Sequence, residues 1–146
     1  MNTIQNTIQG QNKKSGSQVS IKRVGQIGEN IATRLIKEQG YTILDRNYRK
    51  KIGEIDIIAE KNGTVLFFEV KTAYLREGEP KSFQWVFLEE KITPRKQGKI
   101  RKVAMLYLNE KHVDASKILM SVGTICIAIR RDFEVFSFKI LKDVVV

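Results

Sequence analysis

The clearest pattern of hydrophobic and polar positions lies between residues 53 and 71, in the sequence GEIDIIAEKNGTVLFFEVK. Two apolar runs flank Asn62-Gly63. An Asn-Gly pair between such runs is the strongest short-range signal for a β-hairpin, because both central residues of a type I′ turn need a positive φ. The pattern therefore predicts two antiparallel strands joined by a two-residue turn, with Lys61 paired with Thr64.

This register places charged side chains opposite one another at the far end of the hairpin. Asp56 would face Glu69, and Glu54 would face Lys71 and form an ion pair with it. Because side chains alternate along a strand, we expect Glu54, Asp56 and Ile58 on one face. Two like charges placed directly opposite each other destabilise a sheet, so a pair of facing carboxylates suggests a divalent metal between them. A three-residue turn with a bulge would shift the register and remove the opposition.

The rest of the chain shows the periodicities of two helices and three further strands. The expected helices cover residues 22–39 and 93–109, the second with Thr93 as N-cap and Pro94 at its first position. The expected strands cover residues 41–49, 123–130 and 133–140. The order α-β-β-β-α-β-β predicts an α/β fold, a three-layer sandwich with a mixed central sheet of about five strands and flanking helices.

Two segments fall outside these periodic elements. Residues 1–20 are polar and predict a flexible tail before a single domain over residues 21–146. Residues 73–91 form a long connection that contains the aromatic residues Phe83, Trp85 and Phe87. Their alternation favours a contact surface, with stacking on bases as the alternative.

Composition narrows the class of function. The 26 basic and 16 acidic residues give a net charge of +10, which favours a polyanionic partner such as nucleic acid. With only Cys126 and His112, the chain has no internal disulfide and no Cys/His zinc site, and Cys126 lies in an apolar run typical of the core. No apolar run is long enough to span a membrane, and the N-terminus lacks a secretory signal, which predicts the cytoplasm.

Six of the twelve residues from 91 to 102 are basic and cover the start of the second expected helix. Backbone N–H groups and basic side chains at a helix N-terminus suit phosphate oxygens, so we expect contacts to the nucleic-acid backbone here. An ordinary solvated helix face explains the charge equally well. The candidate nucleic-acid contacts are Arg95, Lys96, Lys99 and Lys102.

The charged end of the hairpin has the side chains for metal-assisted phosphodiester hydrolysis. Asp56 and Glu69 supply the carboxylate oxygens that Mg²⁺ prefers. Lys71 could polarise an attacking water or neutralise a phosphate oxygen. Glu29 lies on the same flank of the first helix as Gly25 and other small residues, which would let it reach the carboxylates. The periodicity alone favours a solvated Glu29.

These motifs resemble those of a known family. Glu29, the block GEIDIIA at residues 53–59 and the block FEVKT at residues 68–72 are similar to the PD-(D/E)XK nuclease superfamily. More closely they resemble the YraN-like bacterial family, whose fold is similar to that of archaeal Holliday-junction resolvases. The resemblance covers about residues 28–108 and weakens after that. Ala73 and the run over residues 122–126 depart from the family pattern.

The resemblance implies a metal-dependent endonuclease that hydrolyses nucleic acid, with branched DNA as a candidate substrate and a homodimer as a candidate assembly. It implies Mg²⁺ or Mn²⁺ held by Asp56 and Glu69 with help from Glu29, and Lys71 as the catalytic lysine. Lys96 matches a lysine that the family carries in its second helix. The alternative is a catalytically silent nucleic-acid-binding module on the same fold, or a scaffold that binds neither metal nor DNA.

Overall fold

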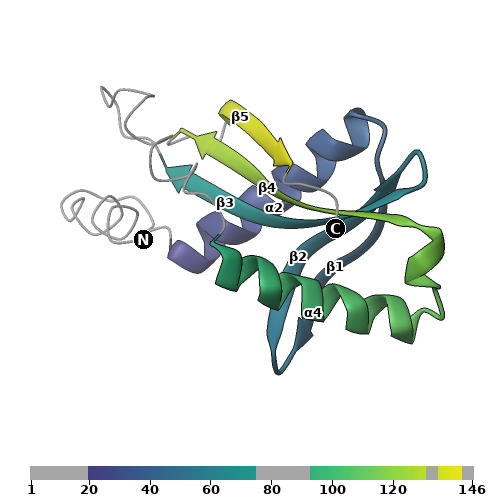
Figure 1. Ribbon diagram of the computed structural model, residues 1–146. Helices are drawn as coiled ribbons and strands as arrows, with labels where there is room; N and C mark the ends of the chain where they lie inside the picture. Colours follow the sequence, from purple (N-terminus) through teal and green to yellow (C-terminus); the bar gives the residue numbers. More distant parts are fainter. Residues whose placement is uncertain (1–19, 75–92, 131–134, 143–146) are drawn as a thin grey trace.

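The computed structural model describes residues 20–74, 93–130 and 135–142 (Figure 1). Its elements are α2 (Ile21–Glu38), β1 (Thr42–Lys50), β2 (Gly53–Lys61), β3 (Thr64–Tyr74), α4 (Pro94–Glu110), η1 (Ala115–Lys117), β4 (Leu119–Ile129) and β5 (Val135–Lys142). The predicted order of helices and strands is confirmed. The predicted tail, except for Ser20, and the aromatic residues Phe83, Trp85 and Phe87 lie outside the described residues.

The five strands form one open mixed sheet in the order β1-β2-β3-β4-β5. The β3–β4 pair is parallel and is connected through α4, while the other three pairs are antiparallel. Helices α2 and α4 pack on opposite faces of this sheet, which gives the predicted three layers (Figure 1). No helix among the described residues is long and apolar enough to cross a membrane.

Each face of the sheet buries its own hydrophobic cluster. The cluster under α2 contains Val24, Ala32, Leu35, Ile36, Tyr41, Ile57, Ala59, Leu66, Phe68, Ile125, Ile127 and Ile129. The cluster under α4 contains Ile55, Ile58, Val65, Phe67, Val103, Ala104, Tyr107, Leu108 and Met120. These two clusters fix the helices against the sheet and so fix the side chains that the helices carry.

Local signals at the helix ends agree with the structure. The Ser20 hydroxyl accepts a hydrogen bond from the Arg23 backbone N–H at 3.2 Å and caps α2. Thr93 caps α4 in the same way, accepting from the Lys96 backbone N–H at 3.2 Å, with Pro94 at the first helical turn as predicted. These caps satisfy backbone donors that a helix N-terminus otherwise leaves unpaired.

The fourth strand begins earlier than predicted. The expected start at Gly123 is wrong, because β4 already pairs with β3 from Leu119 opposite Thr64. The short helix η1 precedes this start, and its cap, Asp114, accepts a hydrogen bond from the Ser116 backbone N–H at 3.0 Å. Cys126 lies fully buried in β4, as its apolar neighbours predicted.

The turn of the β2–β3 hairpin is confirmed. Asn62 and Gly63 have φ values of 51° and 77°, as a two-residue turn of this type requires. The strands pair in the predicted register, from Lys61 opposite Thr64 at the turn. The recorded pairs continue as far as Ile57 opposite Phe68 and end there.

Candidate active site

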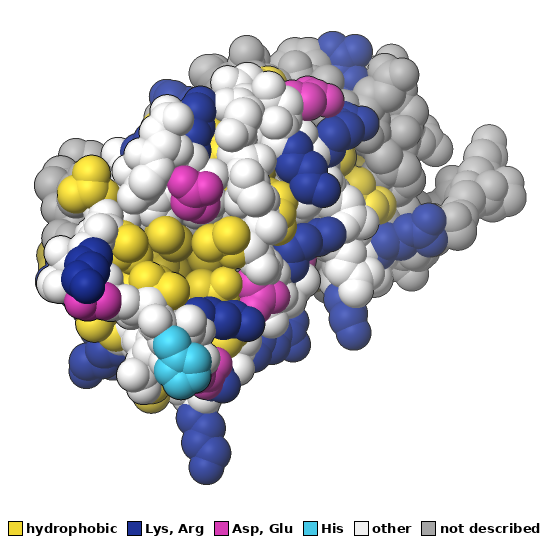
Figure 2. Space-filling model, turned by 90° about the vertical axis from the view of Figure 1, so that its right-hand side faces the viewer, with side chains coloured by type: hydrophobic (Ala, Val, Ile, Leu, Met, Phe, Trp, Pro, Cys, Tyr) yellow, Lys and Arg dark blue, Asp and Glu magenta, His cyan; other side chains and the backbone are white. Residues whose placement is uncertain are grey.

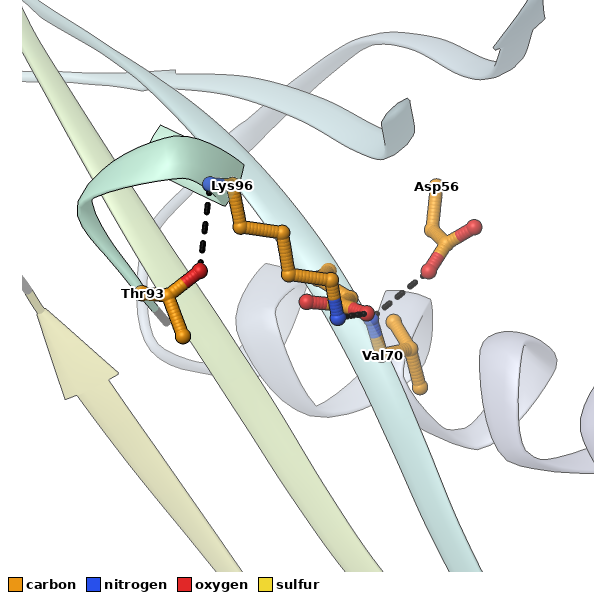
Figure 3. A network of polar contacts seen from close by, with 5 residues as sticks. Asp56, Val70, Thr93 and Lys96 are labelled. Atoms are coloured by element: carbon orange, nitrogen blue, oxygen red, sulfur yellow. Dashed lines mark hydrogen bonds and ion pairs between the residues drawn. The ribbon is translucent and has the colours of Figure 1, made fainter. Parts of the chain in front are cut away.

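Beyond the last recorded pair, the hairpin exchanges its regular ladder for a side-chain contact. The Asp56 carboxylate accepts a hydrogen bond from the Val70 backbone N–H at 2.7 Å (Figure 3). Asp56 and Glu69 therefore lie at the end of the hairpin away from the turn, as the register predicted, but the carboxylate replaces a backbone acceptor of the neighbouring strand. This contact holds the side chain of Asp56, a β2 residue, against the backbone of β3.

The neighbouring strand β1 has an irregular backbone opposite this point. Asn47 has a φ of 52° and lies between the pairs Arg46–Ile57 and Tyr48–Ile55, opposite Asp56. Ile57 packs under α2, whereas Ile55 packs under α4. Residues two apart on a regular strand share a face, so the alternation is interrupted at Asp56.

This interruption corrects one prediction about Glu54, its shared face with Ile58. Ile55 packs in the same cluster as Ile58, so strict alternation, which would put Glu54 and Ile58 on one face, is wrong. Glu54 forms an ion pair with Arg49, its neighbour across β1, at 3.2 Å. The predicted opposition of Glu54 and Lys71 lies beyond the recorded β2–β3 pairs.

The two oxygens of Glu69 differ in their surroundings. Oε1 accepts from the Lys96 ammonium at 3.0 Å (Figure 3). Oε2 is buried and has no hydrogen-bond partner among the described residues. A buried acceptor without a partner is unfavourable by about 1–3 kcal/mol, so binding of a cation or a hydrogen-bond donor to this oxygen would be favourable.

The electrostatics of Asp56 agree with this arrangement. Burial is the largest cause that raises the pKa of Asp56, to about 6. The negative charges of Glu29, Glu69 and Glu54 raise this pKa further, and the hydrogen bond from Val70 lowers it. Asp56 is thus a buried carboxylate close to other negative charges, and a cation beside it would stabilise its charged form.

Glu29 lies near the carboxylates because α2 passes close to β3. A Cβ built on the neighbouring Gly28 would lie 1.8 Å from the Thr72 Oγ1, so only glycine permits this approach. Thr72 directly follows Lys71 on β3. Within the described residues, however, no three or more His, Cys, Asp or Glu side chains lie close enough to hold a metal together. Glu29 therefore contributes charge to the site and completes no three-acid ligand group.

The four predicted nucleic-acid contacts lie on the first half of α4. Arg95, Lys96, Lys99 and Lys102 are exposed, and the first turn of α4 contains no acidic residue. On the end face shown in Figure 2, basic side chains surround a hydrophobic area and acidic ones lie between them. Positive charge on that face is therefore spread out and does not form a continuous stripe.

A cavity of about 330 Å³ connects α4 with the carboxylates. Its polar lining comes from both elements, since Lys96 and Lys99 face a wall that includes Asp56 and Glu69. The remaining lining residues are Ile52, Gly53, Glu54, Ile55, Phe68, Ile100 and Val103. The cavity is therefore acidic on the sheet side, basic on the helix side and apolar at its base.

The residues present suit a hard divalent cation. Asp56 and Glu69 offer carboxylate oxygens, and Glu69 Oε2 is buried with no partner among the described residues. Mg²⁺ typically binds one or two carboxylates and keeps several waters, so two acids are sufficient. The chemistry of the donors fits Mg²⁺ or Mn²⁺.

Two contacts at this site had no counterpart in the sequence analysis. The Val70 N–H that holds Asp56 belongs to the backbone and leaves no mark in the sequence. Lys96 was expected on the nucleic-acid face, and its contact with Glu69 depends on where α4 packs. The close approach of α2 was predicted from Gly25 and other small residues, but a Cβ on Gly25 would meet nothing within 4 Å, and Gly28 is the glycine that permits the approach.

Comparisons with known proteins place the chain in a family. Residues 28–135 match the model of the Uncharacterised protein family UPF0102. A UPF0102 protein of Clostridium botulinum strain Hall is 39% identical over 122 residues, which cover 84% of this chain and 93% of that protein. A UPF0102 protein of Syntrophomonas wolfei is 40% identical over 88 residues, or 60% of this chain and 70% of that protein.

A solved structure, Pyrococcus furiosus SfsA in complex with Ca²⁺, is 18% identical and covers 81% of this chain and 60% of that chain, with a TM-score of 0.30. A TM-score this low does not establish a shared fold. By contrast, the family model matches residues 28–135, more than half of the chain, and the Clostridium protein is 39% identical over 84% of it. The chain therefore belongs to the Uncharacterised protein family UPF0102, the YraN family that its GEIDIIA and FEVKT blocks predicted.

Proposed function

We propose that this protein is a metal-dependent nuclease that hydrolyses phosphodiester bonds at the Asp56–Glu69 site. The observation that carries the proposal is the buried Glu69 Oε2, which has no partner among the described residues, beside a buried Asp56 whose pKa is raised by its burial and by the charges of Glu29, Glu69 and Glu54. A bound cation would stabilise this arrangement.

Each side chain has a role that its position supports. Asp56, oriented by the Val70 N–H, and Glu69 would hold the metal. A bound Mg²⁺ would supply Lewis-acid polarisation of a phosphate oxygen and a more acidic water. Lys71, two residues beyond Glu69 on β3, would neutralise a phosphate oxygen or orient the attacking water. Glu29 would assist through its charge.

The substrate we propose is DNA, with branched DNA as the first form to test. The net charge of +10 favours a polyanion. The N-terminus of α4, with Arg95, Lys96, Lys99 and Lys102 and no acidic residue in its first turn, offers backbone N–H groups and cations to a phosphate. Action in the cytoplasm and assembly as a homodimer belong to the same proposal.

The second candidate is a nucleic-acid-binding module that does not catalyse. One observation favours it: the described residues contain no group of three acids close enough to hold a metal. This candidate predicts DNA binding that weakens as the salt concentration rises, with no cleavage in any divalent metal.

Cleavage of linear and branched DNA with Mg²⁺ or Mn²⁺ separates the two candidates. We expect wild type to cleave, Asp56→Asn and Lys71→Met to lose activity by at least about 100-fold, and the remote control Glu38→Gln to keep it. Binding without cleavage by wild type would favour the silent module. Equal activity in Asp56→Asn, Lys71→Met and wild type would refute the site.

A further inference from the structure

Lys96 forms an ion pair with one of the two carboxylates that would hold a metal. Its ammonium lies 3.0 Å from Glu69 Oε1, and the two side chains are 47% and 27% exposed. The other oxygen of Glu69 is the buried one without a partner. The charge of Glu69 is thus neutralised from the cavity side by a cation that belongs to the chain itself.

The position of Lys96 on its helix makes this contact informative. Lys96 lies in the first turn of α4, where its backbone N–H bonds to the Thr93 cap. The positive end of the helix dipole disfavours a cation there by about 0.3–1 kcal/mol. Glu69 offsets this cost, so the ion pair explains why a lysine is stable at that end of the helix.

The contact is specific to one of the basic side chains on this helix. Lys99 lies three residues further along α4 and lines the same cavity. The ion pairs recorded among the described residues join Glu69 to Lys96 and do not include Lys99. Lys99 therefore provides a matched control, with the same charge, helix and cavity but without the contact to Glu69.

We propose that Lys96 is the exchangeable counter-ion of this site. Its ammonium neutralises Glu69 through Oε1 in the metal-free protein, and a divalent metal that binds Glu69 through Oε1 or through both oxygens must displace it. This inference rests on the proposed metal site and adds a competitor to it. A part-exposed lysine with a flexible stem can leave the carboxylate without unfolding the helix, because the Thr93 cap holds the backbone and not the side chain.

The direct test is a titration of Mn²⁺ into wild type, Lys96→Met and Lys99→Met. Both variants remove one positive charge at the cavity, so their difference isolates the ion pair. We expect Lys96→Met to bind Mn²⁺ about fivefold more tightly than Lys99→Met, the factor that matches the stronger ion pairs of partly exposed groups. Equal or weaker binding by Lys96→Met, with Lys99→Met still binding, would overturn the exchange and leave the metal site standing.

A spectroscopic readout follows the lysine itself. The side-chain NMR signal of Lys96, assigned by its disappearance in Lys96→Met, should shift when Mg²⁺ saturates wild type, and that of Lys99 should shift less. An unchanged Lys96 signal at saturation would refute displacement. If neither wild type nor either variant binds a metal, the metal site and the exchange both fail, whereas binding by Lys96→Met alone supports both.

Discussion

The two ends of the β2–β3 hairpin both combine apolar and polar residues, but their polar groups find hydrogen-bond partners in different ways. At the turn end, strand pairs run without interruption from Lys61–Thr64 to Ile57–Phe68. At the other end, Asp56 bonds to the Val70 backbone N–H in place of a ladder contact, and Glu69 bonds to Lys96 on another element. Regular pairing of β2 with β3 therefore ends next to the proposed site.

The difference is also one of energy. The turn end buries apolar side chains on both faces, which stabilises the fold. The site end holds Asp56 near three other acidic charges, with its pKa raised to about 6. Apolar packing thus stabilises one end of the hairpin, and the proposed site lies at the other, so variants at each end should behave differently.

The largest effect on stability should come from Phe68, the last residue of the regular ladder. Its ring is fully buried, packs edge-on against Tyr41 at 5.9 Å between ring centroids, and fills space that Gly123 leaves open. Phe68→Ala should lower the free energy of unfolding by about 3–5 kcal/mol, measured by urea denaturation. Phe138→Ala, at a ring that is 39% exposed, is the control and should lose far less. Equal losses of unfolding free energy in the two variants would contradict the stabilising role of the buried packing around Phe68.

The site end should instead show a pH dependence that is set by Asp56. Because its folded pKa of about 6 lies above the ordinary pKa of 3.8 for an aspartate, the folded state binds more protons between these values. The free energy of unfolding should therefore fall as the pH rises from about 4 to about 6, by at most about 3 kcal/mol and less where water reaches the carboxylate.

The matched variant for this pH dependence is Asp56→Asn, which keeps an oxygen acceptor for the Val70 N–H and removes the charge. It should flatten the loss of stability between about pH 4 and pH 6 and be more stable than wild type at about pH 7. Chemical denaturation at several pH values measures both. A variant that is less stable than wild type at neutral pH would show that the charge of Asp56 supports the fold.

The sequence predicts the turn end well because its signals are local. Asn62-Gly63 determines the turn, and the register follows from it for every recorded pair. Thr93-Pro94 likewise marks the start of α4 within the chain itself. The early start of β4 at Leu119 was missed, although Leu119 and Met120 are themselves apolar and could have been assigned to a strand.

The site end was predicted only in part, because its geometry depends on other elements. The register placed Glu54, Asp56 and Glu69 together, and the family resemblance added Glu29; the effect of the three glutamates on Asp56 agrees with that. The interrupted alternation at Asp56 lies opposite a positive φ at Asn47 in β1, and the partner of Glu69 depends on the packing of α4. Rules for residue pairs within one hairpin give no information about β1 or α4.

The smallest effects compare two glycines, one at the turn and one in α4. Gly63 has a φ of 77°, so Gly63→Ala should lower the free energy of unfolding by about 1 kcal/mol. Gly98 lies in α4 with open space around a built Cβ, so Gly98→Ala should raise it by about 0.5–1 kcal/mol. Thermal unfolding of both variants measures the two signs. The same sign in both would contradict the assigned backbone conformations.

Calorimetric titration of Mn²⁺ into wild type and Asp56→Asn at neutral pH tests the metal site most directly. Glu60→Gln, at the turn end of β2, is the control for the loss of one acidic charge. We predict saturable binding by wild type and Glu60→Gln, and binding weakened by at least about tenfold in Asp56→Asn. Equal affinity of wild type and Asp56→Asn, or no binding by wild type, would contradict a metal site at Asp56 and Glu69.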